Sequence, residues 1–339
     1  MALNASSTMS EYPINLEWTI AEKRLKALKD STKNEFLQSE KFTAIHSSDV
    51  QYFLRIYPNG NKESNRGKTW VFLWVKLENE KTIEAGFILS VKSAEWSHKF
   101  NFTFEESYGR GISCCTVAEL FDSDMEFIVK GKLTLKVEGI LKIEKAESTC
   151  ARKILQPKRQ QSQSLRDLWN TDFEDFVFVV EEKKIKVHKC VLAVQSPVFA
   201  RMFKSGMRET IENEVVIPDF TFEIVEKAIK LCYKQLHVSD CSVEESLLLL
   251  KFADKYDIAV LQSNLEKYLG DQITVENFCE ISNGAIDGNA LKLQNKCMDF
   301  LVLLFAKKEV VPNLELLYKD FLIGAVKNFV QILHFRIFS

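Results

Sequence analysis

Residues 187–203 read VHKCVLAVQSPVFARMF, and this stretch decides how the second half of the chain is interpreted. Ser196 followed by Pro197 is typical of a helix start, because a serine hydroxyl caps free N–H groups and proline lacks an N–H that would be unpaired there. Three apolar side chains then share one face of the expected helix: Phe199, Met202 and Phe203. Just upstream, residues 176–180 are wholly apolar, as a buried strand requires. The second half therefore mixes strands with helices.

Further helices are expected downstream of this stretch. Ser242 and Glu245 have the spacing of a capping box, which predicts a helix over residues 247–256. Apolar residues at helical spacing predict two more helices, over residues 258–268 and 291–305. No internal repeat is present, which excludes a solenoid.

The first half of the chain has the pattern of strands. Residues 70–75 read WVFLWV, with apolar side chains on both faces of the expected strand. Phenylalanines alternate with polar residues over 100–104, residues 133–138 alternate again, and Pro58-Asn59-Gly60 is a turn signal. Short alternating strands separated by turns favour an antiparallel β-sandwich.

The length of 339 residues favours two domains, and a polar, basic segment divides the halves. We predict a multi-domain α+β protein with an N-terminal antiparallel β-sandwich, an α/β domain and a short all-α C-terminal extension. The expected limits are a flexible N-terminus at 1–15, the sandwich at 16–145, a linker at 146–164, the α/β domain at 165–271 and the helical extension at 272–339.

Composition excludes several classes of function. The net charge of −2 provides no basic field for nucleic acid. Eight cysteines form no C-x-x-C, so we expect no metal site, reduced thiols, and a location in the cytoplasm, the nucleus or both. The N-terminus lacks the pattern of a secretory signal. The apolar stretch 321–338 carries too many polar residues for a membrane span and is expected to be a docked amphipathic helix.

Motifs of catalysis are missing from the sequence. There is no G-x-S-x-G, P-loop, H-E-x-x-H or G-x-G-x-x-G, and the five histidines are widely separated. We therefore expect no enzyme activity, no catalytic residue and no cofactor, and we expect the function to be binding.

Residues from about 173 to 301 resemble a BTB/POZ domain followed by the start of its helical extension. The resemblance rests on an ordered series: Phe173-Glu174-Asp175, the stretch at 187–203, Ala253-Asp254-Lys255-Tyr256 and Thr274-Val275-Glu276-Asn277. Residues from about 16 to 143 resemble a MATH domain, the TRAF-type β-sandwich, through Trp18-Thr19-Ile20, the strand and turn at 53–60, and Phe87. The order of the two domains is that of the MATH-BTB family.

The resemblance implies a function, because MATH-BTB proteins are substrate adaptors of cullin-3 RING ubiquitin ligases. It implies that the MATH domain binds extended, Ser/Thr-rich peptides of client proteins, and that the BTB domain forms a homodimer and binds the cullin. One alternative is a dimeric BTB scaffold or transcription cofactor that recruits no ligase. A further alternative is a TRAF-like signalling adaptor that uses only the sandwich.

The resemblance also implies a client-peptide groove on the sandwich. Carried over by position, its residues are Trp70, Phe87, Phe100, Tyr108, Gly109 and Arg110. The alternative for the Trp and Phe residues is a place in the sandwich core. Relatives carry an aromatic residue where this chain has Arg110, and an arginine favours acidic or phosphorylated peptides.

Two more sites follow from the BTB resemblance. The dimer interface is expected to use Leu165, Leu168, Trp169, Asp175 and His188, although the apolar three could instead pack within one subunit. Asp175 and the pair His188-Lys189 could form a buried charge pair or fix local structure. Met207 and Glu209 match the hydrophobic-x-Glu motif that binds cullin, with a solvated loop as the alternative.

Overall fold

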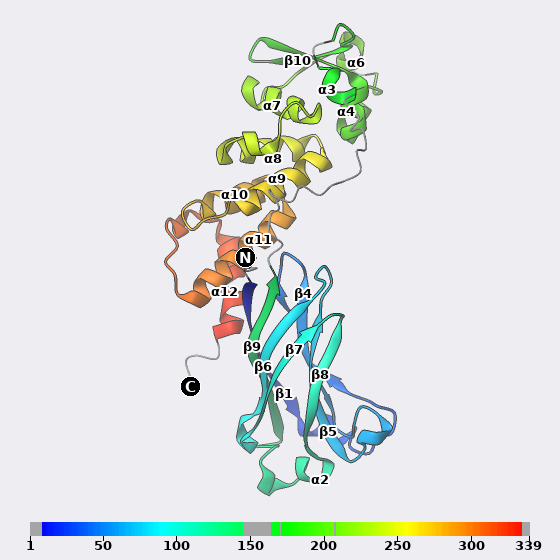
Figure 1. Ribbon diagram of the computed structural model, residues 1–339, viewed down its shortest axis with the longest axis vertical. Helices are drawn as coiled ribbons and strands as arrows, with labels where there is room; N and C mark the ends of the chain where they lie inside the picture. Colours follow the sequence, from blue (N-terminus) through cyan, green and yellow to red (C-terminus); the bar gives the residue numbers. More distant parts are fainter. Residues whose placement is uncertain (1–8, 145–163, 170, 207, 334–339) are drawn as a thin grey trace, which may run out of the picture. The chain divides into compact units, whose positions relative to one another are not determined.

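The computed structural model describes residues 9–144, 164–169, 171–206 and 208–333 (Figure 1). These residues form two compact units. The first contains the N-terminal β-sheets with residues 301–309 and 323–333, and the second contains the described residues from 164 to 300 with residues 310–322.

The N-terminal unit has two antiparallel sheets. One has the order β1-β9-β6-β7 and the other β2-β4-β5-β8, with β3 paired to β4. The strands of the first sheet are β1 (Met9–Ala21), β6 (Ile83–Val91), β7 (Trp96–Phe104) and β9 (Lys132–Glu144). Those of the second are β2 (Leu37–Gln38), β3 (Phe42–Ile45), β4 (Val50–Tyr57), β5 (Lys68–Lys76) and β8 (Tyr108–Thr116). Short helical turns accompany them: α1 (Glu22–Lys26), η1 (Glu63–Asn65), η2 (Lys92–Ala94), α2 (Val117–Leu120) and η3 (Ser123–Met125).

The core lies between the two sheets and confirms the sandwich. Alternate residues of each central strand are buried, as Val71, Leu73 and Val75 are in β5. The other face of β5 carries Trp70, Phe72 and Trp74 on the outside of the second sheet. Phe72 and Trp74 pack with aromatic residues of β4, and Trp70 stacks with Phe72. The tryptophans of β5 therefore face away from the main core.

The first strand begins earlier than the sequence suggested. We expected residues 1–15 to be flexible, but β1 starts at Met9 and pairs with β9 along its whole length, from Met9 opposite Glu144 to Ala21 opposite Lys132. Ile14 and Leu16 alternate into the core, and this short alternation before Trp18 is the signal that was missed.

The second unit contains a three-stranded sheet of order β11-β10-β12, surrounded by helices. Its strands are β10 (Phe176–Val180), β11 (Lys183–Val187) and β12 (Glu214–Val216). The helices are α3 (Ser164–Asp167), α4 (Lys189–Gln195), α5 (Pro197–Met202), α6 (Arg208–Glu212), α7 (Phe222–Cys232), η4 (Val238–Asp240), α8 (Val243–Lys255) and α9 (Ala259–Asp271). Both predicted helix starts are confirmed: the Ser196 hydroxyl accepts the Phe199 N–H at 3.0 Å, and Ser242 with Glu245 forms the capping box.

Helices make up the rest of the described chain: α10 (Phe278–Asp287), α11 (Leu291–Lys307), η5 (Leu314–Leu316) and α12 (Lys319–Leu333). Helix α12 covers most of the apolar stretch at 321–338, with Ala325 buried and the Phe329 ring centroid 5.3 Å from that of Phe305. Residues 334–338 lie outside the described residues. None of the helices described is long and apolar enough to cross a membrane.

Candidate protein-binding sites

Each sheet of the sandwich has two edges within the described residues: β1 and β7 in the first sheet, and β8 and the short strands β2 and β3 in the second. Strand β8 is the last strand of the second sheet and pairs only with β5, and β7 is the last strand of the first sheet and pairs only with β6. An edge strand presents N–H and C=O groups that can pair with an added extended peptide. The β7 and β8 edges are therefore two of the places where the sandwich can accept a peptide as an additional strand, and β8 carries the predicted groove residues Tyr108, Gly109 and Arg110.

Tyr108 opens β8 and is 49% exposed. Its ring centroid lies 6.1 Å from that of Trp74, whereas Trp70 lies opposite Ser113, five residues further along β8. The structure thus brings Trp74, and not the expected Trp70, to Tyr108. Both tryptophans occupy the same face of β5, so only the strand register distinguishes them, and the register was not visible in the sequence.

Gly109 explains how Trp74 comes to lie beside β8. It pairs with Trp74 in the register, and a Cβ at this position would be only 2.5 Å from the indole ring. Glycine leaves room for the indole to lie against the backbone of β8. Gly109 is therefore a supporting position of this surface, since it has no side chain of its own to offer a peptide.

Arg110 extends from β8 to β7. Its guanidinium carbon lies 4.8 Å from the ring centroid of Phe102, within cation–π distance. Phe102 was not among the predicted groove residues, although it belongs to the alternating series at 100–104. We call the surface formed by Trp74, Phe102, Tyr108, Gly109 and Arg110 the edge surface.

Phe87 and Phe100 lie in the core and not on this surface. They are 1% and 7% exposed, and their rings stack with centroids 4.8 Å apart. Both side chains point inward from β6 and β7. Phe87 and Phe100 therefore occupy the sandwich core, which was the alternative to a place in the groove. They can support a peptide site from beneath but offer little surface to touch.

The segment expected at the dimer interface packs partly against its own subunit. The Trp169 ring meets the Tyr233 ring edge-on with centroids 5.1 Å apart, and the Gln235 amide donates to the Arg166 carbonyl. Leu165 and Leu168 are only partly buried. The contact of Trp169 is therefore intramolecular, while the two leucines remain partly accessible.

Asp175 and His188 do not form the charge pair considered from the sequence. The Asp175 carboxylate accepts the Lys189 backbone N–H at 2.8 Å, whereas His188 is buried beside Tyr233. The Tyr233 hydroxyl accepts the His188 backbone N–H at 2.7 Å and lies 2.8 Å from its Nδ1. Burial raises the pKa of Tyr233 to about 12. These residues fix the local backbone.

The same hydrogen bonds reach the Leu168 carbonyl. Because the Tyr233 hydroxyl accepts the backbone N–H of His188, its own proton is free to go to Nδ1, and Nε2–H can then donate to Thr171 at 3.2 Å. Thr171 donates onward to the Leu168 carbonyl at 3.1 Å. A neutral His188 imidazole protonated on Nε2 satisfies every hydrogen bond in this series. The series anchors the expected dimer segment to the domain.

The expected cullin motif is only partly described. Met207 lies outside the described residues. Glu209 stands on the short helix α6 and is half-buried, while its neighbour Arg208 donates to the Glu212 carboxylate at 2.8 and 2.9 Å. Ile211 on the same helix is 75% exposed. Helix α6 thus carries an exposed apolar side chain and a half-buried carboxylate, two residues apart and on different faces of the helix.

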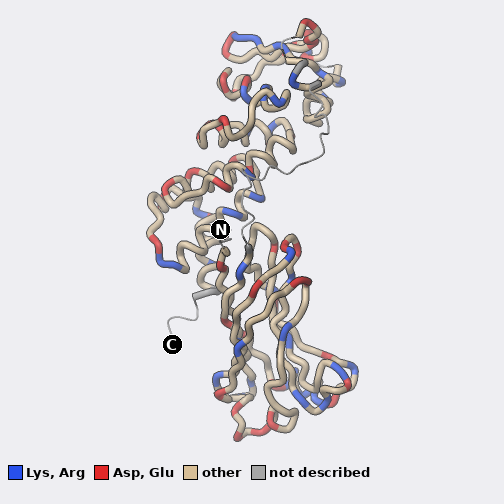
Figure 2. The backbone as a smooth tube through the Cα atoms, viewed as in Figure 1, with Lys and Arg blue, Asp and Glu red and all other residues tan. Residues whose placement is uncertain are grey.

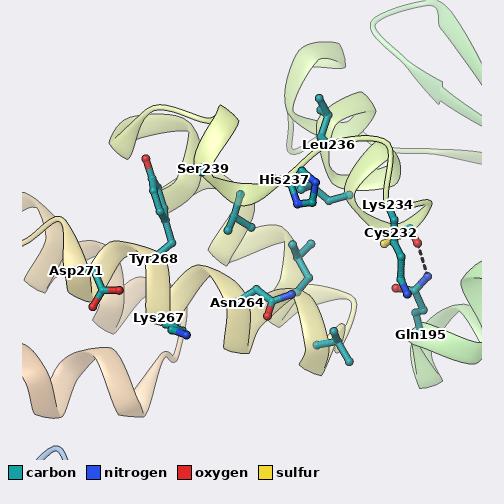
Figure 3. Close-up of a pocket in the computed structure, with 14 residues that line it drawn as sticks. Gln195, Cys232, Lys234, Leu236, His237, Ser239, Asn264, Lys267, Tyr268 and Asp271 are labelled. Carbon is teal, nitrogen blue, oxygen red and sulfur yellow. Dashed lines mark hydrogen bonds between the residues drawn. The ribbon is translucent and has the colours of Figure 1, made fainter. Parts of the chain in front are cut away.

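A hollow of about 520 Å³ lies in the second unit between the ends of α4 and α7, the turn η4 and helix α9. Figure 3 shows Asn264, Lys267, Tyr268 and Asp271 along α9, facing residues of the 234–239 segment. The Gln195 amide donates to the Cys232 carbonyl at 2.7 Å at one end. No sequence signal pointed to this hollow, because four separate elements form it.

The lining of the hollow combines charged, apolar and thiol side chains. Burial raises the pKa of the Cys232 thiol to about 12, so the thiol stays protonated and is no nucleophile at neutral pH. Lys234, Lys267 and Asp271 line the hollow together with the apolar Leu236 and Val260. In the described part of the chain, no three His, Cys, Asp or Glu side chains are grouped to hold a metal ion.

The described residues thus form a β-sandwich with open strand edges, followed by an α/β domain with helices. Residues 164–273 match the BTB/POZ domain. The chain is 25% identical to TD and POZ domain-containing protein 3 of Mus musculus, over 79% of this chain and 76% of that protein. It is 26% identical to TD and POZ domain-containing protein 2 of Mus musculus, over 71% of this chain and 69% of that protein.

Protein maternal effect lethal 26 of Caenorhabditis elegans is also similar, with 26% identity over 78% of this chain and 68% of that protein. The chain is therefore a BTB/POZ-domain protein and a homologue of the MATH-BTB proteins. BTB domains commonly dimerise and bind cullin-3.

Proposed function

We propose that this chain is a substrate-recognition adaptor of a cullin-3 RING ubiquitin ligase. The observation that carries the proposal is the presence, on one chain, of a BTB/POZ domain and a separate sandwich whose edge strand displays an exposed tyrosine and arginine. The proposed domain limits are 9–145 for the MATH domain, since β1 begins at Met9, 146–164 for the linker, 165–271 for the BTB domain and 272–339 for the extension.

The client site is proposed at the edge surface. A Ser/Thr-rich peptide in extended form would pair its backbone with the β8 edge, while Tyr108 contacts one of its side chains. Arg110 lies over Phe102 and keeps donors available for an acidic or phosphorylated side chain of the peptide. Trp74, on the neighbouring strand β5, packs against the Tyr108 ring and supports it.

The ligase contact is proposed on the BTB domain, at Met207 and Glu209. An apolar side chain can fill a pocket in a helical partner while a carboxylate accepts charge-assisted hydrogen bonds. The homodimer would form through Leu165 and Leu168, which precede the first strand and remain partly exposed. Asp175, His188 and Trp169 would support that segment from within the subunit.

Such a protein needs no catalytic group, because its role is to raise the effective concentration of a client near the ubiquitin-transfer site. A dimer offers two client sites and two ligase contacts, so weak peptide contacts add into useful avidity. We propose that the protein acts as an adaptor in the cytoplasm or the nucleus.

Client capture tests the proposal in cells. Proteins that accumulate when the chain is removed should also bind the sandwich, and their binding should be lost with Tyr108→Ala. If client levels do not change while the protein still forms a dimer, the alternative of a scaffold that recruits no ligase is favoured.

A further inference from the structure

The outer face of the first sheet holds a second pocket, on β1 and β9 and away from the edge surface. It has a volume of about 520 Å³. Nine residues line it: Glu17, Thr19, Lys92, Ser93, Val129, Lys130, Lys132, Thr134 and Lys136. Figure 2 shows acidic and basic residues interspersed along the chain, whereas this pocket gathers four lysines around a single carboxylate.

Lys136 forms the floor of the pocket. In the strand register it lies between Glu17 on β1 and Ser90 on β6, and its side chain is only 3% exposed. Lysine is almost never buried to this extent unless it is paired. The Nζ atom contacts the Glu138 carboxylate at 2.9 Å. A buried cation is thus positioned where the pocket can reach it.

Burial lowers the pKa of Lys136 by disfavouring the charged form, and the charge of Lys92 lowers it further, while Glu138 and the pocket residue Glu17 oppose these effects. Lys92 belongs to the turn η2, whose Ser93 also lines the pocket. Lys92 and Lys136 therefore place two cations at one pocket, and an anion held between them would be attracted by both.

A tight turn holds two more lysines at the pocket rim. Val129 and Lys132 exchange backbone hydrogen bonds of 2.9 and 3.0 Å around Lys130 and Gly131. Both central residues have positive φ, 51° and 72°, which is the geometry of a type I′ hairpin turn. The turn fixes the backbone from which Lys130 and Lys132 reach the pocket.

Hydroxyl groups complete the lining. Thr19 and Thr134 lie opposite each other in the register with their hydroxyl oxygens 3.2 Å apart, and Ser93 adds a third hydroxyl. Lysine ammonium groups and hydroxyls are common donors to phosphate oxygens. A volume of this size is within the range of small-molecule sites.

We propose that this pocket binds a phosphoryl group, with Lys92, Lys130, Lys132 and Lys136 around it. The group comes from a small free phosphate compound or from a phosphorylated side chain of a bound protein. The site is independent of the proposed adaptor role, because it uses the opposite sheet from Tyr108 and none of the residues of the edge surface.

Titration calorimetry of the full chain with pyrophosphate, at constant ionic strength set by chloride, tests the site. We expect saturable binding that weakens at least tenfold in the double variant Lys130→Gln with Lys132→Gln, both exposed lysines. The control Lys68→Gln, an exposed lysine on β5, should change the affinity by less than twofold. Tyr108→Ala should leave pyrophosphate binding unchanged.

A second titration with a phosphoserine peptide separates the two sources of the group. Binding of pyrophosphate supports a free phosphate compound, and binding of the peptide alone, lost in the same double variant, supports a phosphorylated partner. If neither probe binds, or if the double variant binds as tightly as the wild type, the proposal is wrong.

Discussion

At the scale of single residues, exposure separates the side chains that can touch a client from those that only support the fold. Tyr108 is half exposed on an edge strand, whereas Phe100, eight residues earlier, is buried against Phe87. Both are aromatic and both were expected in the groove. Only their strand positions and their burial distinguish them. Replacement of Tyr108 should therefore lower peptide affinity, and replacement of Phe100 should lower the free energy of unfolding.

Replacing Tyr108 with alanine should weaken client-peptide binding at least about thirtyfold, because removal of an aromatic anchor from the centre of an interface costs about 2 kcal/mol or more. The free energy of unfolding should change by less than about 1 kcal/mol, since half of the side chain is in solvent. Calorimetry with a client peptide and urea denaturation measure the two quantities.

Phe36→Ala and Phe100→Ala are the matched controls. Phe36 is exposed on the same domain, outside the edge surface, and its removal should leave peptide affinity unchanged. Phe100→Ala should instead lower the free energy of unfolding by about 3–5 kcal/mol, as loss of a buried ring does. If Tyr108→Ala unfolds the domain, the tyrosine belongs to the fold and the edge surface is not the client site.

Buried thiols predict a loss of stability at alkaline pH. Burial raises the pKa of Cys232 and of Cys297 to about 12, from 9.0 for a free thiol. In the unfolded chain these thiols lose protons above pH 9, while the folded chain keeps them. The stabilisation is therefore complete below pH 9 and is lost as the pH rises toward 12.

The size of this effect is up to about 1.4 kcal/mol per pH unit for each such thiol. Urea denaturation of Cys232→Ala between pH 8 and 10.5 should show a smaller decrease in the free energy of unfolding than the wild type. Replacement of the exposed Cys190 is the control. Equal slopes for Cys232→Ala and the wild type would show that this thiol is not shielded in solution.

At the scale of elements, local patterns could be predicted from the sequence and strand register could not. The hydroxyl of Ser196 and the pair Ser242 and Glu245 cap their helices as expected, because the contacts span only three residues. The pairing of β5 with β8 joins residues more than thirty positions apart, with a register shift between Thr69 and Trp70. Trp74 was therefore missed and Trp70 was chosen in its place.

Sites built from several elements were the hardest to predict. The hollow beside α9 and the lysine pocket each combine side chains from separate segments, none of which forms a motif. Phe102 was visible as part of an alternating strand, but its contact with Arg110 crosses between the two sheets. Burial and pairing, which decide such contacts, depend on the complete fold.

The segment before β10 carries a prediction about assembly. Changing Leu165 and Leu168 to Asp should convert the expected dimer to monomer, because two charges would replace the apolar contact across the two-fold axis. The fold should be retained, since both leucines are only partly buried. Light scattering of the full chain measures the mass.

Leu248→Asp serves as the control, because Leu248 is an exposed leucine on α8 outside this segment. It should leave the dimer mass unchanged. A double variant of Leu165 and Leu168 that keeps the mass of a dimer would place the subunit interface elsewhere in the domain.

At the scale of the whole molecule, we propose that each partner binds a separate surface of the protein. The edge surface would hold the client, residues 165–168 would join two subunits, and Met207 with Glu209 would contact the cullin. Because no residue is shared among these surfaces, a change at one should leave the other two intact. This independence distinguishes an adaptor from a scaffold that only dimerises.

The most direct test is the affinity of the full chain for the N-terminal domain of cullin-3, measured by calorimetry beside the variant Met207→Asp with Glu209→Lys. We expect saturable binding of one cullin per subunit, weakened at least about thirtyfold in the variant by loss of an apolar contact and reversal of a charge. Dimer mass and client affinity should be unchanged in the variant. A wild-type chain that forms a dimer and binds clients but shows no affinity for cullin-3 would show that the protein is not a cullin-3 adaptor.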